Sequence, residues 1–206
     1  NDNALNYHNK LEEYSKTPLI QLNGLAKRIG VNKIFIKDES KRFGLNAYKV
    51  LGASYAISQS LIKNPEIKTF CTATDGNHGR AVAWAAKING RKAIIYVPKE
   101  TTLKRIQAIE KYGAKVIQIN GHYDQACEEA KKISFSKKWC LIQDKAWEEY
   151  MEIPALILSG YLTLFKEMED TIHDSLKPKI DLVFLQAGVG SMAAAGIYYY
   201  LNRYGK

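Results

Sequence analysis

Hydrophobic residues follow two alternating spacings along the middle of the chain. Four short apolar runs have the length and composition of buried strands, at residues 69–73, 92–97, 115–119 and 139–142. Between these runs apolar residues recur three or four positions apart, as on one face of a helix, over residues 77–89, 102–112 and 123–135. Strands that alternate with helices of this length are typical of parallel βαβ units. The pattern therefore predicts an α/β fold with a doubly wound parallel sheet.

The flanking regions carry further elements of the same kind. In chain order these are extended segments at 17–22 and 33–37, helices at 25–30, 49–63, 149–168 and 192–204, and a last strand at 181–186. The helix that begins at Lys49 follows a loop with a glycine, and Asn46 is its expected N-cap.

Composition places the chain among proteins with an ordinary core. At 206 residues and 46% hydrophobic, it can form one large or two small domains. No run of eighteen apolar residues is present, so we expect no membrane association, and the first residues include neither a signal-peptide pattern nor an initiator Met. The three cysteines, an odd number without metal-ligand spacing, favour free thiols in the cytoplasm.

The formal net charge of +9 raises the question of nucleic-acid binding. Lysines are spread along the chain and usually lie near Glu or Asp, and no basic stripe alternates with aromatic residues. We therefore expect a solvated basic surface and no nucleic-acid partner, with some of the charge available to an anionic ligand.

Candidate chemistry follows three of the predicted strands. Asp75, Gly76, Asn77 and His78 come after residues 69–73, Asp144 comes after 139–142, and a glycine-rich loop at 188–192 comes after 181–186. Ligands of parallel sheets bind at the carboxyl ends of the strands, so we expect these residues to gather on one edge. Alone, Asp75 and Asp144 are equally explained as N-caps, and His78 as a structural histidine at a helix start.

The loop at residues 188–192 opens a predicted helix, and its backbone N–H groups suit a phosphate. With Ala193 it also matches the dinucleotide pattern G-x-G-x-x-A, but the acidic residue expected about twenty positions later falls at or beyond the end of the chain. A tight turn without a ligand explains the loop equally well.

Lys49 stands in the first turn of its helix, where the backbone dipole disfavours a cation. The cost disappears if the amine is neutral or forms a Schiff base beside a bound phosphate. An exposed lysine that extends to water is the simpler alternative.

Together these motifs resemble the fold-type II enzymes that depend on pyridoxal 5'-phosphate (PLP), whose fold is that of the tryptophan synthase β subunit. The resemblance rests on Lys49 after Asn-Ala-Tyr, the Gly-Asn-His-Gly turn at 76–79 and the loop at 188–192. Within this group the chain is most similar to the diaminopropionate ammonia-lyases, which share Asp before that turn. The implied fold is a three-layer αβα arrangement of parallel sheets with flanking helices.

The resemblance also implies roles. Lys49 would hold PLP through a Schiff base, Asn77 would contact the ring hydroxyl, and the phosphate would bind the backbone of Gly188, Val189, Gly190, Ser191 and Met192. An amino-acid substrate would contact Asp75, Gly76, His78 and Asp144. In D- and L-2,3-diaminopropionate, Asp75 would take the α-proton of the D isomer and Asp144 that of the L isomer. β-Elimination would then give pyruvate and ammonia, with PLP as the electron sink.

Two alternatives remain open. A serine/threonine dehydratase of the same fold would use the same lysine, although Asp75 would place a negative charge near the substrate carboxylate. A non-catalytic nucleotide-binding module would explain the last loop but neither Lys49 nor the two aspartates.

Members of the resembled family are roughly twice as long as this chain. We therefore expect a fragment with incomplete cofactor binding and little or no turnover. Residues 46–164 would form the smaller α/β domain, and residues 1–45 with 165–206 would open the larger domain. A cytoplasmic homodimer is expected from the resemblance alone.

Overall fold

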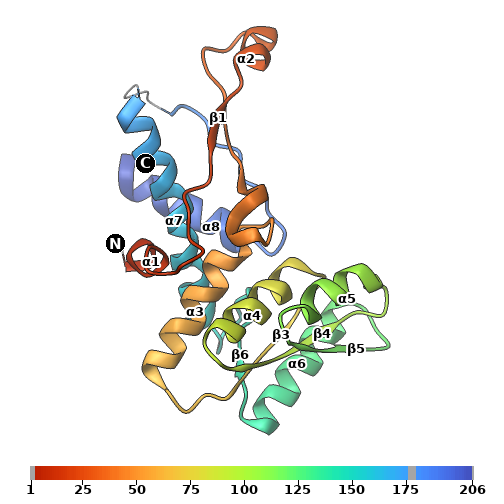
Figure 1. Cartoon of the computed structure of the whole chain (residues 1–206). Coiled ribbons are helices and arrows are strands. Elements are labelled where there is room, and N and C mark those ends of the chain that lie inside the picture. Colours follow the sequence, from red (N-terminus) through yellow and green to blue (C-terminus); the bar gives the residue numbers. More distant parts are fainter. Residues whose placement is uncertain (1–2, 176–179, 206) are drawn as a thin grey trace.

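The computed structural model describes residues 3–175 and 180–205 (Figure 1). Its helices are α1 (Asn3–His8), α2 (Asn23–Ile29), α3 (Lys49–Lys63), α4 (Asn77–Ile88), α5 (Leu103–Glu110), α6 (Tyr123–Lys137), α7 (Glu152–Ser175) and α8 (Ser191–Tyr204), with a 3-10 segment at Glu39–Gly44. Its strands are β1 (Leu19–Gln21), β2 (Phe35–Lys37), β3 (Thr69–Ala73), β4 (Lys92–Val97), β5 (Lys115–Gln118) and β6 (Cys140–Leu141). None of the described helices is both long and apolar enough to cross a membrane.

The central sheet has four parallel strands in the order β5-β4-β3-β6. Side chains of β3 alternate between its faces: Phe70 packs into the main core, whereas Cys71 and Ala73 pack with Ala126 and Ala130 of α6. Figure 1 shows α4 and α5 on one face of this sheet and α6 on the other. The predicted three-layer αβα arrangement is confirmed.

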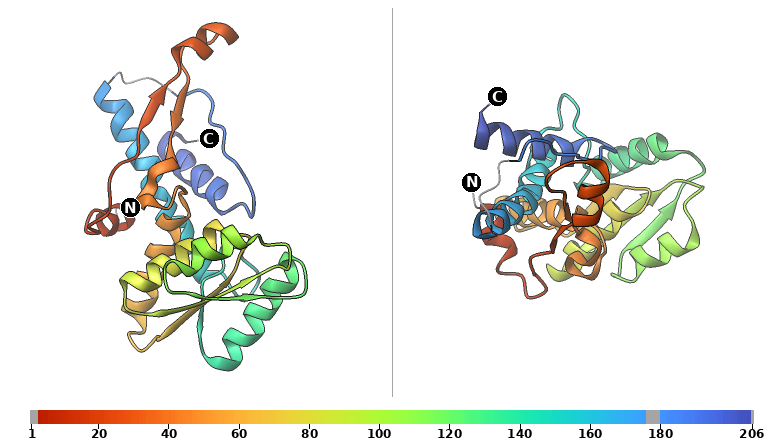
Figure 2. Two further views of the ribbon diagram at one scale, coloured as in Figure 1. Left: turned by 45° about the vertical axis from the view of Figure 1, so that its right-hand side comes forward. Right: turned by 90° about the horizontal axis from the view of Figure 1, so that it is seen from above.

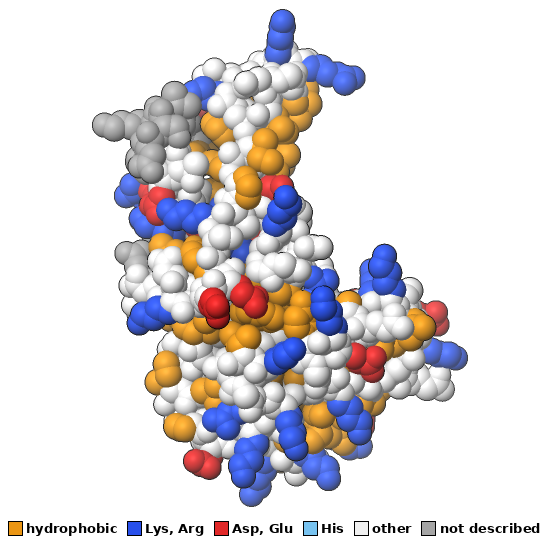
Figure 3. Space-filling view, in the orientation of Figure 1, with side chains coloured by type: hydrophobic (Ala, Val, Ile, Leu, Met, Phe, Trp, Pro, Cys, Tyr) orange, Lys and Arg blue, Asp and Glu red, His pale blue; other side chains and the backbone are white. Residues whose placement is uncertain are grey.

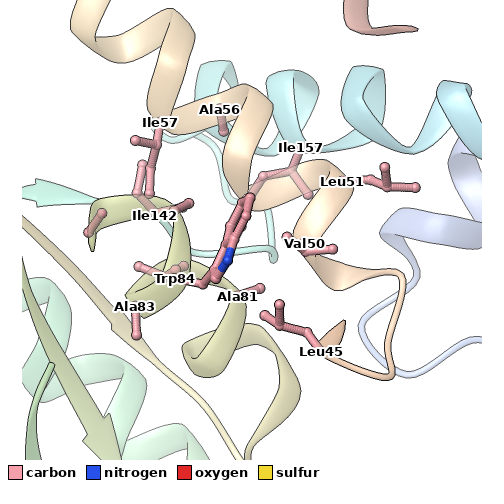
Figure 4. Packing of buried hydrophobic residues seen from close by; sticks show 14 of the residues in the cluster. Leu45, Val50, Leu51, Ala56, Ile57, Ala81, Ala83, Trp84, Ile142 and Ile157 are labelled. Carbon is pink, nitrogen blue, oxygen red and sulfur yellow. The ribbon is translucent and has the colours of Figure 1, made fainter. Parts of the chain in front are cut away.

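The main core joins α3, α4 and α7. Trp84 of α4 lies among Val50 and Ile57 of α3, Ile142 after β6 and Ile157 of α7 (Figure 4). The four aliphatic side chains are fully buried, and burial of this kind stabilises the fold by roughly 1.5–3 kcal/mol per side chain. The core therefore fixes α3, the helix that begins with Lys49.

Helices α3 and α7 cross at two glycines. A Cβ atom on Gly160 would lie 2.4 Å from the backbone oxygen of Leu51, and one on Gly52 would lie 2.6 Å from the ring of Tyr161. No side chain fits between the two backbones at this point, so glycine is needed for the close approach.

Helix α1 is held against the same crossing by His8. The Nδ1 atom of this buried ring is 2.8 Å from the Thr163 hydroxyl, and its Nε2 atom is 3.0 Å from the Leu51 carbonyl oxygen. Because a carbonyl only accepts, Nε2 carries the proton and Nδ1 accepts from Thr163. Burial lowers the pKa of His8 to about 4, so the ring is neutral near pH 7.

An arm formed by β1, α2 and β2 projects from the body (Figure 2). Strands β1 and β2 pair antiparallel with Leu19 opposite Lys37, so these two extended segments lie outside the parallel sheet that the pattern predicts. The hydrophobic face of the arm is partly exposed, through Ile20, Leu25, Ile29, Val31 and Ile36.

At the base of the arm lies a group of buried charges that we call the Arg42 cluster: Arg42, Glu167, Glu39, Lys37, Tyr14 and Thr17. Arg42 donates to both oxygens of Glu167 at 2.7 Å and to both oxygens of Glu39 at 2.7 and 2.8 Å. Lys37 and Tyr14 donate to Glu167 at 2.6 Å. Burial would raise the pKa of Glu167, but the hydrogen bonds and charge of Arg42, with Lys37 and Tyr14, outweigh burial and lower it.

Two sequence-based predictions are wrong. Residues 181–186 form no strand: they are irregular, and Leu182 and Phe184 are 71% and 87% exposed, because no described strand pairs with them. Asn46 is not the N-cap of α3. It lies in the left-handed region at φ 56°, and Tyr48 precedes the helix without a side-chain cap.

Lysine and arginine side chains are spread over the face of the molecule shown in Figure 3 rather than gathered in one stripe. This distribution agrees with the solvated basic surface expected from the sequence.

Candidate functional site

Three predicted site residues meet at the carboxylate of Asp144, just after β6. The Oδ2 atom of Asp144 accepts a hydrogen bond from Lys49 Nζ at 2.5 Å, and His78 Nδ1 lies 3.7 Å from the same oxygen. Asp144 and His78 are buried, whereas the Lys49 side chain keeps 18% of its surface exposed. Residues from three separate segments therefore gather on one edge of the sheet, as expected.

The glycine-rich loop reaches the same point. Ser191, the first residue of α8, donates a hydrogen bond from its hydroxyl to the backbone oxygen of Asp144. Gly190 precedes the helix in the left-handed region at φ 91°. A Cβ on Gly188 or Gly190 would meet no heavy atom within 4 Å, so the loop is open on its outer side. The first N–H groups of α8 have no partner within the helix and can bind an anion there.

Thr74, whose role the sequence did not indicate, shapes the loop between β3 and α4. Its hydroxyl oxygen accepts hydrogen bonds from the backbone N–H of Gly76 at 2.9 Å and of Gly79 at 3.1 Å. Thr74 is buried, while Asp75 and Asn77 are exposed. The turn thus holds two polar side chains outward. The signal available in the sequence was the hydroxyl residue at the start of a glycine-containing turn.

His78 is buried directly behind this loop. Its Nε2 atom donates to the backbone oxygen of Ile142 at 2.7 Å, which fixes the tautomer, because a carbonyl can only accept. Its Nδ1 atom has no hydrogen-bond partner within the described residues. Burial lowers the pKa of His78, so the ring is neutral near pH 7.

The charge of Asp144 depends on its basic neighbours. Burial would raise the pKa of this carboxyl, but the positive charges of His78 and Lys49 and the Lys49 hydrogen bond outweigh burial and hold the pKa below its ordinary value. Because His78 is neutral near pH 7, Lys49 is the cation that stabilises the Asp144 carboxylate there.

Asp75 stands apart from this contact. Its carboxylate makes no hydrogen bond or ion pair within the part of the chain that the structure describes, and it is exposed. Burial raises the pKa of Tyr123, and the charges of Asp144 and Asp75 raise it further, so both carboxylates lie near this hydroxyl. The structure therefore places one buried and one exposed carboxylate at this edge of the sheet.

Gln143 positions Asp144, a role that sequence reasoning missed. Its buried side-chain oxygen accepts from the Thr72 hydroxyl at 2.9 Å and from the Ala73 N–H at 3.0 Å. Its backbone N–H donates to the Tyr150 hydroxyl at 2.8 Å, and that hydroxyl donates to the Leu141 oxygen at 2.7 Å. These bonds join the ends of β3 and β6. The only local signal of this role in the sequence was the place of the Gln143 amide, between a predicted strand and an aspartate.

Comparison with known proteins identifies relatives over nearly the whole chain. Residues 10–206 match the protein family described as pyridoxal-phosphate dependent enzyme. Diaminopropionate ammonia-lyase from Salmonella typhimurium is 42% identical over 97% of this chain and 55% of that protein. A biosynthetic L-threonine dehydratase from Haemophilus influenzae is 32% identical over 86% of this chain and 32% of that protein.

A solved structure shows the same fold. Diaminopropionate ammonia-lyase from Escherichia coli, in complex with an aminoacrylate–PLP azomethine reaction intermediate, superposes with a TM-score of 0.94 at 42% identity. The match covers 98% of this chain and 55% of that one. The chain spans about half the length of the ammonia-lyases it matches.

Proposed function

Because the chain belongs to the family of pyridoxal-phosphate dependent enzymes, we propose that the whole protein acts as a PLP-dependent ammonia-lyase on 2,3-diaminopropionate. The observation that carries this proposal is the meeting of Lys49, Asp144 and Ser191. It places an amine, a carboxylate and a helix N-terminus at one edge of the sheet. The products would be pyruvate and ammonia.

The described residues fit this cofactor. Its phosphate would bind the first N–H groups of α8, where Gly188 and Gly190 leave the backbone accessible. Lys49 would bind its aldehyde carbon, and the exposed amide of Asn77 would contact its ring. When bound, PLP supplies an electron sink that makes the α-proton of an amino acid removable by a carboxylate.

The two aspartates would divide the substrate isomers between them. We assign the α-proton of the L isomer to Asp144, which stays ionised at neutral pH beside Lys49. The exposed carboxylate of Asp75, on the loop after β3, would take the α-proton of the D isomer. Gly76 and His78 would complete the surface that contacts the substrate.

A serine/threonine dehydratase is the second candidate function. It is supported by the relative at 32% identity, against 42% for the ammonia-lyase. Asp75 opposes it. Both substrates carry an α-carboxylate, but only diaminopropionate has a second amine, which a carboxylate at this loop would attract more strongly than the hydroxyl of serine. The non-catalytic nucleotide-binding module leaves the contact between Lys49 and Asp144 without a role.

Borohydride reduction tests cofactor attachment. The chain is mixed with PLP and reduced, and the modified peptide is mapped by mass spectrometry. We expect label on Lys49 in the native chain and none at that position in Lys49→Met. The control Lys63→Met removes an exposed lysine that pairs with Glu152, and in it we still expect label on Lys49. Label spread evenly over surface lysines would contradict the assignment of Lys49.

Measurements of turnover test which substrate the protein uses. With the whole protein, diaminopropionate should be consumed at least about tenfold faster than serine. Asp75→Asn should reduce turnover of the D isomer by about 10²-fold or more and spare the L isomer, and Asp144→Asn should do the reverse. Equal losses for both isomers in both variants would refute the division of roles.

We also propose the domain division stated above, with residues 46–164 as the smaller domain and 1–45 with 165–206 as part of the larger one. A homodimer would cover apolar residues that the arm exposes, such as Ile29 and Ile36. A reducing cytoplasm would keep Cys71, Cys127 and Cys140 as free thiols.

A further inference from the structure

The Oδ2 atom of Asp144 has two basic neighbours, and only one of them is hydrogen-bonded to it. Lys49 Nζ lies at 2.5 Å, while His78 Nδ1 lies at 3.7 Å, too far for a direct hydrogen bond. The two basic groups come from different elements, α3 and α4.

The tautomer of His78 determines what it can do for Asp144. Since Nε2 carries the proton that binds Ile142, Nδ1 presents a lone pair toward the carboxylate. A neutral ring in this state can accept a proton on Nδ1 but cannot donate one from it. The only buried nitrogen of the site without a partner among the described residues therefore faces the carboxylate as a proton acceptor.

Lys49 must lose a proton before it can react with an aldehyde, because only the neutral amine is a nucleophile. We propose that Asp144 and His78 form the route by which this proton leaves. The inference rests on the function proposed above. The Nζ–H bond of Lys49 breaks as an O–H bond forms on Asp144 Oδ2. Rotation of the carboxyl then closes the 3.7 Å gap to His78 Nδ1, and the O–H bond breaks as an Nδ1–H bond forms. The positive charge moves from the ammonium to the imidazolium, and Asp144 ends as an ionised carboxylate between them.

The charges at the candidate site support this exchange. Burial lowers the pKa of His78, the Asp144 charge raises it and the Lys49 charge lowers it. Loss of the Lys49 proton removes the one opposing cation, and the carboxylate then favours protonation of the ring.

The other titratable groups near Asp144 do not compete for the proton. Tyr48 precedes α3, Tyr123 and Cys127 lie in α6, Tyr150 follows β6 and Tyr161 lies in α7. Burial raises the pKa of the four hydroxyls and of the thiol, so all five groups stay neutral. Lys49 and His78 are the basic groups whose charges act on Asp144.

Nitrogen-15 NMR of the cofactor-free protein tests the route directly. At pH 7 the native ring of His78 should be the neutral tautomer with its proton on Nε2. In Lys49→Met the protonated fraction of His78 at a fixed pH should rise about tenfold, and in Asp144→Asn it should fall. Lys63→Met, which removes an exposed ion pair, should leave His78 unchanged.

A second measurement follows the rate at which Lys49 is labelled by PLP and borohydride. The amide of His78→Gln can still donate to Ile142 but lacks the Nδ1 acceptor. Labelling at pH 7 should slow about tenfold and recover at high pH, where solvent hydroxide removes the proton. A merely structural role of His78 would slow labelling equally at every pH, which would overturn the proposal.

These measurements separate the two proposals. If Lys49→Met raises the protonated fraction of His78 but PLP does not label Lys49, the coupling stands and the proposed cofactor function fails. If the native ring carries its proton on Nδ1, or if Lys49→Met leaves His78 unchanged, the proton route is overturned whatever the cofactor does.

Discussion

The Arg42 cluster and the candidate site both contain buried charges, and they differ in how completely their polar atoms are paired. In the Arg42 cluster every guanidinium nitrogen of Arg42 donates to an acceptor, and Glu167 accepts from Arg42, Lys37 and Tyr14. At the candidate site, Asp144 binds Lys49, but Nδ1 of His78 has no partner within the described residues. Both regions join distant parts of the chain.

Two buried histidines, His8 and His78, show the same contrast. His8 has both ring nitrogens bonded, whereas His78 has one. A buried polar atom without a hydrogen bond costs about 1–3 kcal/mol. Complete pairing is typical of a contact that stabilises the fold, and incomplete pairing is typical of a site where a proton or ligand must still arrive. The difference fits a structural role for the Arg42 cluster and the reactive role that we propose for the candidate site.

The largest expected effect is that of Arg42→Met. The substitution leaves the buried carboxylates of Glu167 and Glu39 without their arginine, so unfolding free energy should fall by about 3–5 kcal/mol. Urea denaturation measures this. Lys63→Met, which removes a pair of side chains 69% and 62% exposed, should change stability by less than about 0.5 kcal/mol. A loss below about 1 kcal/mol in Arg42→Met would show that the cluster does not stabilise the fold.

Acidification should have the next largest effect on stability. The pKa of His8 is about 4 in the folded chain and 6.5 when unfolded, so the unfolded chain binds more protons between these values. Stability from this residue is complete above pH 6.5 and falls as the pH drops to 4, by about 3 kcal/mol. Glu167, with its pKa lowered from 4.5, adds a loss only below that pH.

Urea denaturation at several pH values checks the acid effect against His8→Gln. The variant should be less stable near neutral pH, but its unfolding free energy should change less than that of the native chain between pH 6.5 and 4. The remaining change would come from His78, whose pKa burial also lowers. Equal slopes in the two proteins would assign the acid sensitivity to other groups.

Among the substitutions at buried groups, Asp144→Asn should have the smallest effect on stability. Lys49 loses its partner but remains 18% exposed and can extend toward water, so the unfolding free energy should change by less than about 1 kcal/mol. Chemical denaturation measured beside Arg42→Met gives the contrast within one chain. Similar losses in the two variants would show that the site is structural as well, and the distinction drawn above would fail.

The sequence predicted what depends on local spacing. The bounds of β3 and β4 were predicted to the residue, because an apolar run between polar turns marks a buried strand. The meeting of His78 and Asp144 followed from the rule that strand ends of a parallel sheet share an edge.

What depends on a distant partner was not predicted. Residues 181–186 have the composition of a strand, but no described strand pairs with them. Arg42 and Glu167 are 125 positions apart, and nothing in either local pattern indicates the other. Whether a given polar residue is left unpaired, as Nδ1 of His78 is, depends on side-chain geometry that spacing does not describe.

The crossing of α3 and α7 also bears on how such sequences can diverge. A methyl group at position 160 would collide with the backbone at Leu51, and one at position 52 would collide with Tyr161, so neither glycine can drift independently. A larger residue at either position would require a change in the facing helix, which would also displace Lys49 three residues upstream of Gly52. Across aligned relatives, positions 52, 160 and 161 should therefore vary together, and substitutions there should be rarer than their distance from the reacting groups would suggest.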